Sequence, residues 1–278
     1  RRRRPDENVW TCLPQRGLFY IYFDDSVFGY EEGVERMATL TNEKKLPNNV
    51  KVRYENNIHE DVGEYEATAF FTGDSNHEDI EPMHAKLSIT KQDIDLKNVI
   101  IKKTQTTRYD GTDKDFEVEV PKLIKVSKTY IDENGRELNG KPRNAGAYTV
   151  KLSYDLDPAY NIDNFNILNV PSKDGVLIIQ KKILDLSEYN FSRQTYTYDG
   201  KAHDFDVETN IVDGEKIENK LPEEIVVNKT YIVNGEEIFG KPLEVGTYIV
   251  NFDVQLKEGY LVENFDIQNA PTTSGRLT

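Results

Sequence analysis

The sequence predicts an all-β chain of three tandem, small antiparallel β modules in an elongated array. Short runs in which apolar and polar residues alternate predict strands with one buried face. Asp-Gly and Asn-Gly pairs stand between these runs, and such pairs favour tight turns because glycine tolerates a positive φ. No stretch of ten or more residues keeps a helical period. The same spacings also occur three times, which indicates repeated modules rather than one large domain.

Three blocks of the chain carry the same residues in nearly the same register. Each block opens with a tyrosine followed by Asp-Gly, or by Glu-Glu in the first block, at Tyr30, Tyr109 and Tyr198. Each block then has a bulky apolar residue seven positions on, a Gly-x-Tyr motif, and an aromatic residue or histidine twelve positions after that second tyrosine. The three sets are Met37, Phe116 and Phe205; Tyr65, Tyr148 and Tyr248; and His77, Tyr160 and Tyr260. Offsets held over three blocks predict homologous modules.

The joints between the blocks set the predicted boundaries. Residues 89–94 and 179–184 contain no Pro, Gly or Ser, so we expect each last strand to pass almost directly into the next module and to limit bending. The predicted divisions are 1–17, a flexible or added N-terminal segment, followed by modules at 18–91, 92–181 and 182–278. We expect the last strand of the third module to be truncated, because residues 275–278 match only the start of the longer run 175–181.

The third block shows its expected elements most clearly. Its predicted strands are residues 195–198, 205–209, 225–232, 237–239, 246–254 and a last strand from 276, with turns at Asp199-Gly200 and Asn234-Gly235. The second block repeats the pattern with strands over 116–120, 126–131 and 148–154. The first block is compact, with strands over 50–54, 65–71 and 87–89 and a turn at 55–57. Six or seven short strands in each block predict an immunoglobulin-like sandwich, and a β-grasp sheet with a short helix is the alternative.

Composition excludes several classes of partner. The net charge is −14 and the mean hydropathy is −0.67, whereas a nucleic-acid surface needs an excess of Lys and Arg. The run Arg1–Arg4 is therefore interpreted as a flexible end, a cleavage junction or added sequence rather than a nucleic-acid or membrane patch. No apolar run reaches the roughly 18–20 residues that cross a bilayer, so we expect no membrane insertion in this segment.

Cysteine usage restricts how the modules are held together. Cys12 is the single cysteine, so no disulfide can form within the chain and packing alone must hold the modules. We interpret Cys12 as a bystander, and the alternatives are an intermolecular disulfide or a reactive thiol.

The repeated motifs resemble a known class of surface repeat. Tyr198-Asp199-Gly200, Gly246-Thr247-Tyr248 and the Leu-x-Ile-x-Lys run at 177–181 resemble the MBG-type repeats of bacterial cell-surface proteins. Residues 71–77 resemble the Phe-x-Gly-Asp-x-Asn-Tyr segment of these repeats, with His77 in the tyrosine position. The resemblance covers roughly residues 18–278, and Glu31-Glu32 departs from its Asp-Gly pair. It implies an adhesin-like protein, extracellular, secreted or attached to the cell wall, in which such modules form a stalk.

The sequence signals for a catalytic or metal site are weaker than those for the repeats. His59, His77 and His84 lie in the first block and His203 lies in the third, at spacings that match no compact metal motif. Acidic loop residues offer oxygen ligands of the kind that Ca²⁺ prefers, but they do not follow EF-hand spacing. These residues are Asp110, Asp113, Asp115, Asp132, Glu133, Asn134, Asp155, Asp157 and Asp163. Nucleophile and phosphate-loop motifs are missing from the sequence. We therefore expect no enzyme activity, no catalytic or metal site and no cofactor.

Two further sets of residues have a structural and a functional interpretation. Lys128 and Lys229 occupy equivalent strand positions, where a buried acid and amide partner would allow an intramolecular isopeptide bond; an exposed lysine is the simpler interpretation. Tyr148 and Tyr248 fit sugar stacking, but a tyrosine two residues after glycine at the start of a long strand is more typical of a packed corner whose hydroxyl bonds to the backbone.

Two classes of function follow. In the first, the modules are a monomeric stalk whose partners are the neighbouring modules, and which presents a distal adhesive region. In the second, the first module binds a host protein or glycan directly. A large exposed apolar patch would favour binding, and short stiff joints would favour the stalk.

Overall fold

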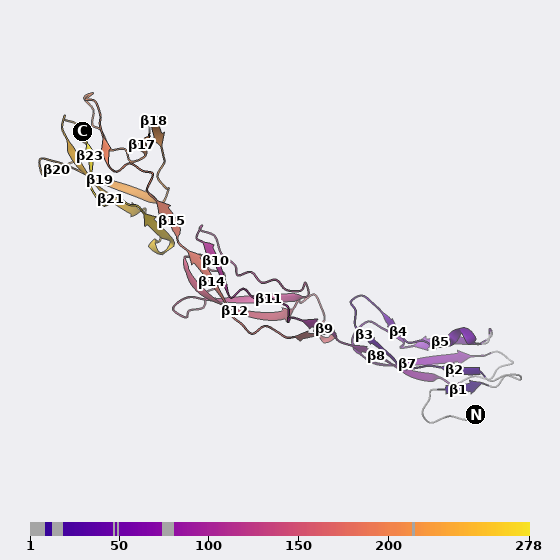
Figure 1. Ribbon diagram of the computed structural model, residues 1–278. Coiled ribbons are helices and arrows are strands. Elements are labelled where there is room, and N and C mark those ends of the chain that lie inside the picture. The colour runs from indigo at the N-terminus through magenta and orange to yellow at the C-terminus, as the bar shows by residue number, and fades with distance from the viewer. Residues whose placement is uncertain (1–8, 13–18, 47, 49, 74–80, 213–214) are drawn as a thin grey trace. The chain divides into compact units, whose positions relative to one another are not determined.

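The computed structural model describes residues 9–12, 19–46, 48, 50–73, 81–212 and 215–278. Within these ranges the regular elements are strands and three short 3-10 helices, and none is an α-helix. The all-β fold class is thereby confirmed (Figure 1). A β-grasp sheet needs a helix on one face, so the sandwich-type interpretation fits the described elements better. His77 and Arg1–Arg4 lie outside the described residues.

The strands fall into three consecutive parts of the chain. The N-terminal part contains β1 (Val9–Cys12), β2 (Phe19–Tyr22), β3 (Ser26–Gly29), β4 (Arg36–Met37), η1 (Glu43–Lys45), β5 (Lys51–Glu55), β6 (Ile58–His59), β7 (Gly63–Thr72) and β8 (Met83–Thr90). The middle part contains β9 (Gln92–Asp95), β10 (Thr104–Arg108), β11 (Ile124–Ile131), β12 (Gly146–Leu156), η2 (Ile162–Asn164), β13 (Phe165–Leu168) and β14 (Gly175–Gln180). The C-terminal part contains β15 (Lys182–Asp185), β16 (Arg193–Gln194), β17 (Thr209–Val212), β18 (Glu215–Glu218), β19 (Ile225–Val233), β20 (Glu236–Ile238), β21 (Tyr248–Leu256), η3 (Val262–Asn264), β22 (Phe265–Gln268) and β23 (Gly275–Leu277).

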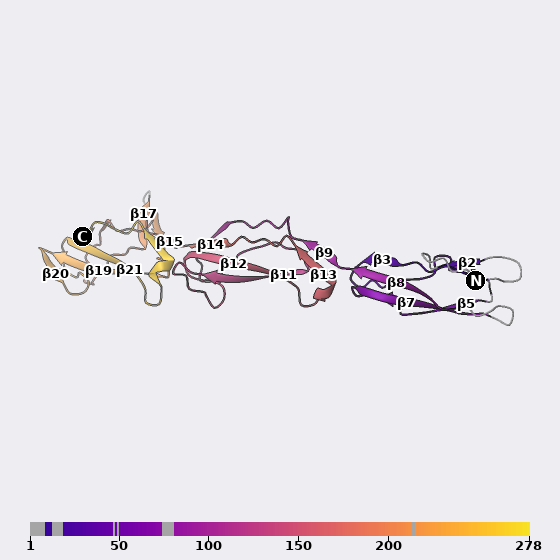
Figure 2. The same cartoon turned by 90° about the horizontal axis from the view of Figure 1, so that it is seen from below.

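Three main sheets have the same internal order. Their strands are ordered β3-β8-β7-β5, β10-β14-β12-β11 and β16-β23-β21-β19-β20, and Figure 2 lets the reader follow β8 beside β7 and β14 beside β12. The pairing is mixed, which differs from the purely antiparallel pairing expected. The first strand of each sheet runs parallel to the closing strand, in the pairs β3–β8, β10–β14 and β16–β23. The central pairs are antiparallel.

By its contacts the chain forms two compact units. One comprises Arg1–Ile100, Glu119–Ser127 and Tyr154–Ser172, and the other comprises Ile101–Val118, Lys128–Ser153 and Lys173–Thr278. Their boundaries differ from the sequence divisions at 91 and 181, and the division into three modules stays a prediction. We use first, second and third repeat below only for the sequence ranges 18–91, 92–181 and 182–278.

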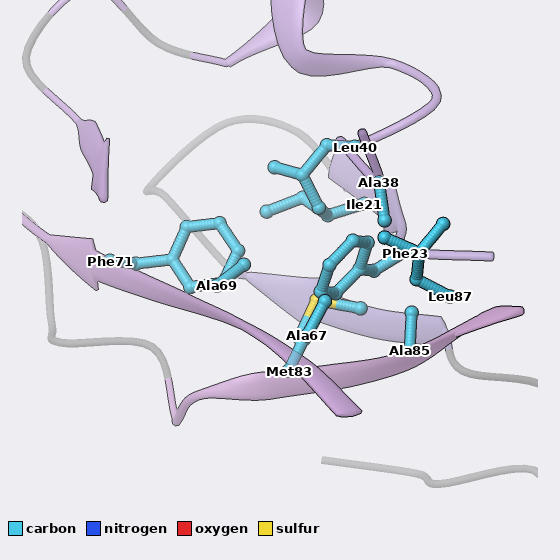
Figure 3. Close-up of a cluster of buried hydrophobic side chains, with 10 residues drawn as sticks. All are labelled: Ile21, Phe23, Ala38, Leu40, Ala67, Ala69, Phe71, Met83, Ala85 and Leu87. Atoms are coloured by element: carbon cyan, nitrogen blue, oxygen red, sulfur yellow. The ribbon is translucent and has the colours of Figure 1, made fainter. Parts of the chain in front are cut away.

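The core of the first unit confirms the predicted alternation. Met83, Ala85, Leu87 and Ile89 are the buried positions of β8, in strict period two as expected for a strand with one buried face. Met83, Ala85 and Leu87 meet the buried residues of β7 and of the segment before β3, as Figure 3 shows for Phe23 beside Leu87. The complete buried cluster is Ile21, Phe23, Ala38, Leu40, Ala67, Ala69, Phe71, Met83, Ala85 and Leu87.

The second unit contains two equivalent cores. One is formed by Phe116, Tyr130, Tyr148, Val150, Leu177 and Ile179. The other is formed by Phe205, Val207, Tyr231, Tyr248, Val250 and Leu277. Both cores place one aromatic residue from an extended segment against the inner face of a sheet, as the repeat pattern predicted for Phe116 and Phe205.

The segments around Phe116 and Phe205 are not strands, which corrects the predicted strands over 116–120 and, before β17, over 205–208. A side-chain amide takes the place of a neighbouring strand. Gln105 donates from Nε2 to Glu117 O at 2.7 Å and accepts from Glu117 N at 2.8 Å. Gln194 makes the same two contacts with the backbone of Asp206. Alternating burial therefore occurs without a ladder of backbone hydrogen bonds.

The first repeat places a different residue in this core position. Met37 is 52% exposed, so its expected match to Phe116 and Phe205 is wrong. Leu40 matches them instead, because its backbone N donates to the hydroxyl of Tyr54 at 3.0 Å. The equivalent bonds join Phe116 to Tyr130 at 3.0 Å and Phe205 to Tyr231 at 2.8 Å.

Two predicted local features have definite outcomes in the third repeat. The hairpin at Asn234-Gly235 is confirmed, because β19 and β20 pair on either side of it and both residues have positive φ, at 54° and 86°. The expected strand over 195–198 is wrong, because β16 ends at Gln194, where it pairs with Leu277 at the end of β23. Tyr196 N still donates to Thr278 O at 2.9 Å, but residues 195–198 are not a strand.

Candidate functional site

The Gly-x-Tyr motif forms a packed corner in every repeat. The hydroxyl of Tyr148 donates to the backbone oxygen of Asn144 at 2.9 Å, and that of Tyr248 donates to Glu244 O at 2.8 Å. In the first repeat the hydroxyl of Tyr65 donates to Asp61 O at 3.0 Å. Tyr148 and Tyr248 are buried. These contacts confirm the structural interpretation of both tyrosines and leave no free ring face of the kind that a sugar would stack on.

A buried asparagine lies beside two of these corners. Asn164 ends η2 and Asn264 ends η3, and each is only 1% exposed. Each 3-10 helix runs directly into a short strand, β13 or β22. These strands pair in parallel with the first strand of the same repeat, β9 or β15. The short parallel pair therefore fixes where each asparagine lies.

In the first compact unit, the side chain of Asn164 hydrogen-bonds to the corner of the first repeat. Its Oδ1 accepts from Val62 N at 2.9 Å, and its Nδ2 donates to Asp61 Oδ1 at 2.8 Å. The two partners precede the asparagine by 102 and 103 residues in the sequence. A buried amide that lost these partners would cost about 1–3 kcal/mol, so the contact is specific as well as close.

In the second compact unit, Asn264 makes the same pair of contacts. Its Oδ1 accepts from Ala145 N at 2.7 Å, and its Nδ2 donates to Asn144 Oδ1 at 3.1 Å. Asn144 is the residue whose backbone oxygen receives the hydroxyl of Tyr148. Corner and asparagine thus form one polar unit, which we call the Asn joint.

An aromatic pair accompanies each Asn joint. The opening tyrosine Tyr30 meets Phe165 edge-on at 5.2 Å between ring centroids, and Tyr109 meets Phe265 edge-on at 5.4 Å. Both phenylalanines follow the buried asparagine directly. Edge-on pairs of this kind add about 0.5–1.5 kcal/mol beyond area burial. The opening tyrosine of the first and of the second block therefore packs against the repeat that follows it.

Sequence reasoning missed the two asparagines, although a signal for them was present. Tyr160 and Tyr260 were recognised as repeated, and each is followed four positions later by Asn-Phe. Both tyrosines lie edge-on to that phenylalanine, at 6.2 Å and 5.6 Å. The repeated Tyr-x-x-x-Asn-Phe segment, which we call the Asn-Phe insert, is absent from the first block.

The lysines considered for isopeptide bonds lie in ion pairs. Lys128 Nζ is 2.8 Å from Asp115 Oδ1, and Lys141 Nζ is 2.8 Å from Asp115 Oδ2. The hydroxyl of Tyr130 also donates to Asp115. Burial raises the pKa of Asp115, but these hydrogen bonds outweigh it and hold the pKa well below its usual range. Amide formation needs a neutral amine and a protonated acid, so this environment favours the charged pair.

The third repeat has the same ionic cluster. Lys229 and Lys241 lie 3.2 Å and 3.3 Å from the carboxylate of Asp204, which also accepts the hydroxyl hydrogen of Tyr231. Burial raises the pKa of Tyr231, and the hydrogen bond to Asp204 raises it further. The phenol therefore stays protonated and holds the carboxylate in place.

The described histidines, His59, His84 and His203, belong to no group of three side chains that could hold a metal ion. His59 stacks on Tyr65 at 3.5 Å, His84 lies 3.2 Å from Glu66, and His203 lies 2.9 Å from Asp199. Each has a separate local partner, which fits packing and surface pairing.

Several acidic loop residues already bind basic side chains or backbone N–H groups of this chain. Asp110 accepts from Thr112 N and pairs with Lys114, Asp113 pairs with Arg143, Asp132 pairs with Arg136, Glu133 accepts from Ala147 N, and Asp157 accepts from Ala159 N. Among the residues that the structure describes, no group of three His, Cys, Asp or Glu side chains is arranged to hold a metal ion. No helix in the described ranges is long and apolar enough to span a membrane.

Comparison with known proteins gives little further information. No protein-family model matches the chain, and no curated protein matches it. One similar solved structure is SGBP-B of the Bacteroides ovatus mixed-linkage glucan utilization locus, in complex with a mixed-linkage heptasaccharide. It is 10% identical, with a TM-score of 0.18 over 92% of this chain and 66% of that chain, so this chain spans slightly less than two thirds of its length. At this TM-score the similarity carries no argument about fold or function.

Proposed function

We propose that this chain is a structural spacer of an extracellular bacterial surface protein, in which tandem β modules hold an adhesive region away from the cell. The single observation that carries the proposal is the Asn joint, which occurs twice with the same chemistry. A spacer must hold its neighbouring modules in a fixed relation. A buried asparagine whose amide both accepts and donates a hydrogen bond, beside an aromatic pair, supplies such a fixed relation without a disulfide.

The surface chemistry supports the same proposal. A net charge of −14 keeps exposed modules soluble and mutually repelling. The residues that recur between repeats are corner tyrosines, turn glycines, core aromatics and the paired Lys and Asp of the ionic clusters, whereas no histidine or cysteine recurs. A module copied for its chemistry would be expected to repeat its reactive groups too.

Small-angle X-ray scattering tests the spacer proposal. A compact globule of this length has a radius of gyration of about 19 Å, from 2.2·N^0.38. We expect the intact chain to give a value well above this and to remain monomeric over a concentration series. A value close to the compact figure would contradict the proposal.

Direct binding by the first repeat is the alternative function. A hollow of about 390 Å³ is lined by Glu64, Glu66, His84 and Lys86. Lys86 lies 2.6 Å from Glu64, and His84 lies 3.2 Å from Glu66, so these polar side chains already have partners across strands β7 and β8. Glycan or host-protein binding by the intact chain that is lost in His84→Ala, with an unchanged melting temperature, would favour this alternative.

A further inference from the structure

The third repeat carries a corner that matches the two Asn joints, but none of the described residues supplies an insert to it. Its Tyr248 hydroxyl donates to Glu244 O, as Tyr148 does to Asn144 O and Tyr65 to Asp61 O. Glu244 thus stands where Asp61 and Asn144 offer a side-chain oxygen to the buried asparagine. Val245 stands where Val62 and Ala145 offer a backbone N–H.

The surroundings of this corner are exposed and apolar. Val245 is 81% exposed, and Tyr198 is 61% exposed. The equivalents of Tyr198, which are Tyr30 and Tyr109, pack against Phe165 and Phe265. Leu243 is also exposed. A hollow of about 380 Å³ lies between these residues and is lined by Tyr198, Leu243, Glu244 and Val245 among others. We call this surface the open face.

We infer that the open face receives the Asn-Phe insert of a further module of the same kind. The insert's asparagine lies between the Glu244 carboxylate and the backbone N–H of Val245, and its phenylalanine lies edge-on to Tyr198. All three interacting groups of the open face have counterparts in both Asn joints. This inference rests on the proposed spacer function and names the partner that such a spacer requires at this surface.

A second copy of this chain is a poor occupant for the open face. The two inserts in the described residues, at Asn164-Phe165 and Asn264-Phe265, are already seated on corners of their own chain. The first repeat has no Asn-Phe pair at this position in its sequence. An occupant must therefore bring an additional insert, and a β module with the Tyr-x-x-x-Asn-Phe segment does so.

The chain itself provides the means to test this inference. Thr278 aligns with Ile178, so a copy of residues 179–278 appended after Thr278 continues the strand as at the preceding joint. Amide hydrogen exchange is then compared between the intact and the extended chain over residues 242–248. We expect exchange at Val245 to slow by about tenfold or more in the extended chain, because a buried hydrogen bond must open first.

Two matched variants in the appended copy separate docking from mere proximity. Asn→Ala at the copied position of Asn264 is expected to restore the exchange rate of the intact chain. Gln→Ala at the copied position of Gln268 is expected to keep the protection, because the Gln268 side chain donates to the nearby Asp266 in the same strand.

Equal amide exchange in the intact and the extended chain would overturn the inference. Protection that survives the asparagine substitution would overturn it too. Protection of the intact chain that grows with its own concentration would identify a second copy as the occupant, and protection by millimolar cellohexaose would identify a sugar site. If docking fails while Asn264→Ala still loosens the joint inside the intact chain, the inference is wrong and the spacer proposal stands.

Discussion

The side-chain oxygen of Asn264 accepts a hydrogen bond from the backbone N–H of Ala145 at 2.7 Å, across 119 residues of sequence. The asparagine is buried, and its amide nitrogen is bonded as well. Both halves of the amide are therefore satisfied, which a buried polar group requires. Asn164 repeats the arrangement, so the joint is a property of the repeat and not of one site.

The hydroxyl of Tyr148 should contribute measurably to stability through its bond to Asn144 O. We expect Tyr148→Phe to lower the free energy of unfolding by about 0.5–1.5 kcal/mol and Tyr148→Ala to lower it by about 3–5 kcal/mol. Urea unfolding followed by circular dichroism measures both values. Tyr198→Phe is the matched control, because Tyr198 is largely exposed and its change should be small. If Tyr148→Ala melts like the parent, the corner is not structural.

The charge cluster at Asp115 should make stability depend on pH in a definite direction. The folded-state pKa of Asp115 is lowered, relative to about 3.9 in the unfolded chain. Its contribution is therefore fully present above the unfolded pKa and is lost as the pH falls through the folded pKa. We expect Asp115→Asn to be less stable than the parent at pH 7, with a difference that shrinks below about pH 4.

The matched control for this charge removal is Asp155→Asn at an exposed position of β12. Its difference from the parent should stay small at every pH. A stability difference for Asp115→Asn that is constant from pH 7 to pH 2 would contradict the assigned role of the cluster.

Calcium should leave the chain's melting temperature unchanged. The acidic loops pair with Lys, Arg and turn amides within the described residues. A cation bound only to the folded state at a hundredfold excess over Kd adds about 2.7 kcal/mol. Thermal melts with millimolar calcium and with chelator should therefore coincide, and a rise of several degrees with calcium would reveal a structural metal site.

Glycine is required at the start of β14 because Phe116 fills the adjacent space. A Cβ on Gly175 would lie 2.6 Å from Cε2 of the Phe116 ring. We expect Gly175→Ala to cost about 1–3 kcal/mol, as overpacked cores do. Gly29→Ala in β3 is the control, because nothing lies within 4 Å of its Cβ position. Equal melting temperatures for the two variants would show that Phe116 moves aside freely.

The sequence predicted features whose cause is local. The alternation of β8, the Asn234-Gly235 hairpin and the Tyr148 corner depend on neighbouring residues, and each was recognisable in one stretch of chain. The match of Met37 to Phe116 failed because the residue of the first repeat that is equivalent to Phe116 is Leu40, three positions later. The strand predicted at 116–120 failed because the side chain of Gln105 replaces a strand.

The Asn joints could not be predicted because their partners are remote. Asn164 follows Tyr160-Asn161-Ile162-Asp163, and such a polar run is typical of an ordinary turn. Nothing near it in the sequence indicates that Val62 is its partner. Only the register between the second and third repeats held a signal, in the matching Asn-Phe pairs.

The most direct test of the account is the distance distribution across the second Asn joint. With Cys12 replaced by serine, spin labels at the exposed positions Lys151 and Gln255 lie on β12 and β21. We expect a narrow distribution in the parent and in Gln268→Ala. Asn264→Ala should broaden it, because Ala145 N and the Asn144 side chain lose their partner. A distribution in Asn264→Ala as narrow as that of the parent would contradict the claim that the buried asparagine holds the joint.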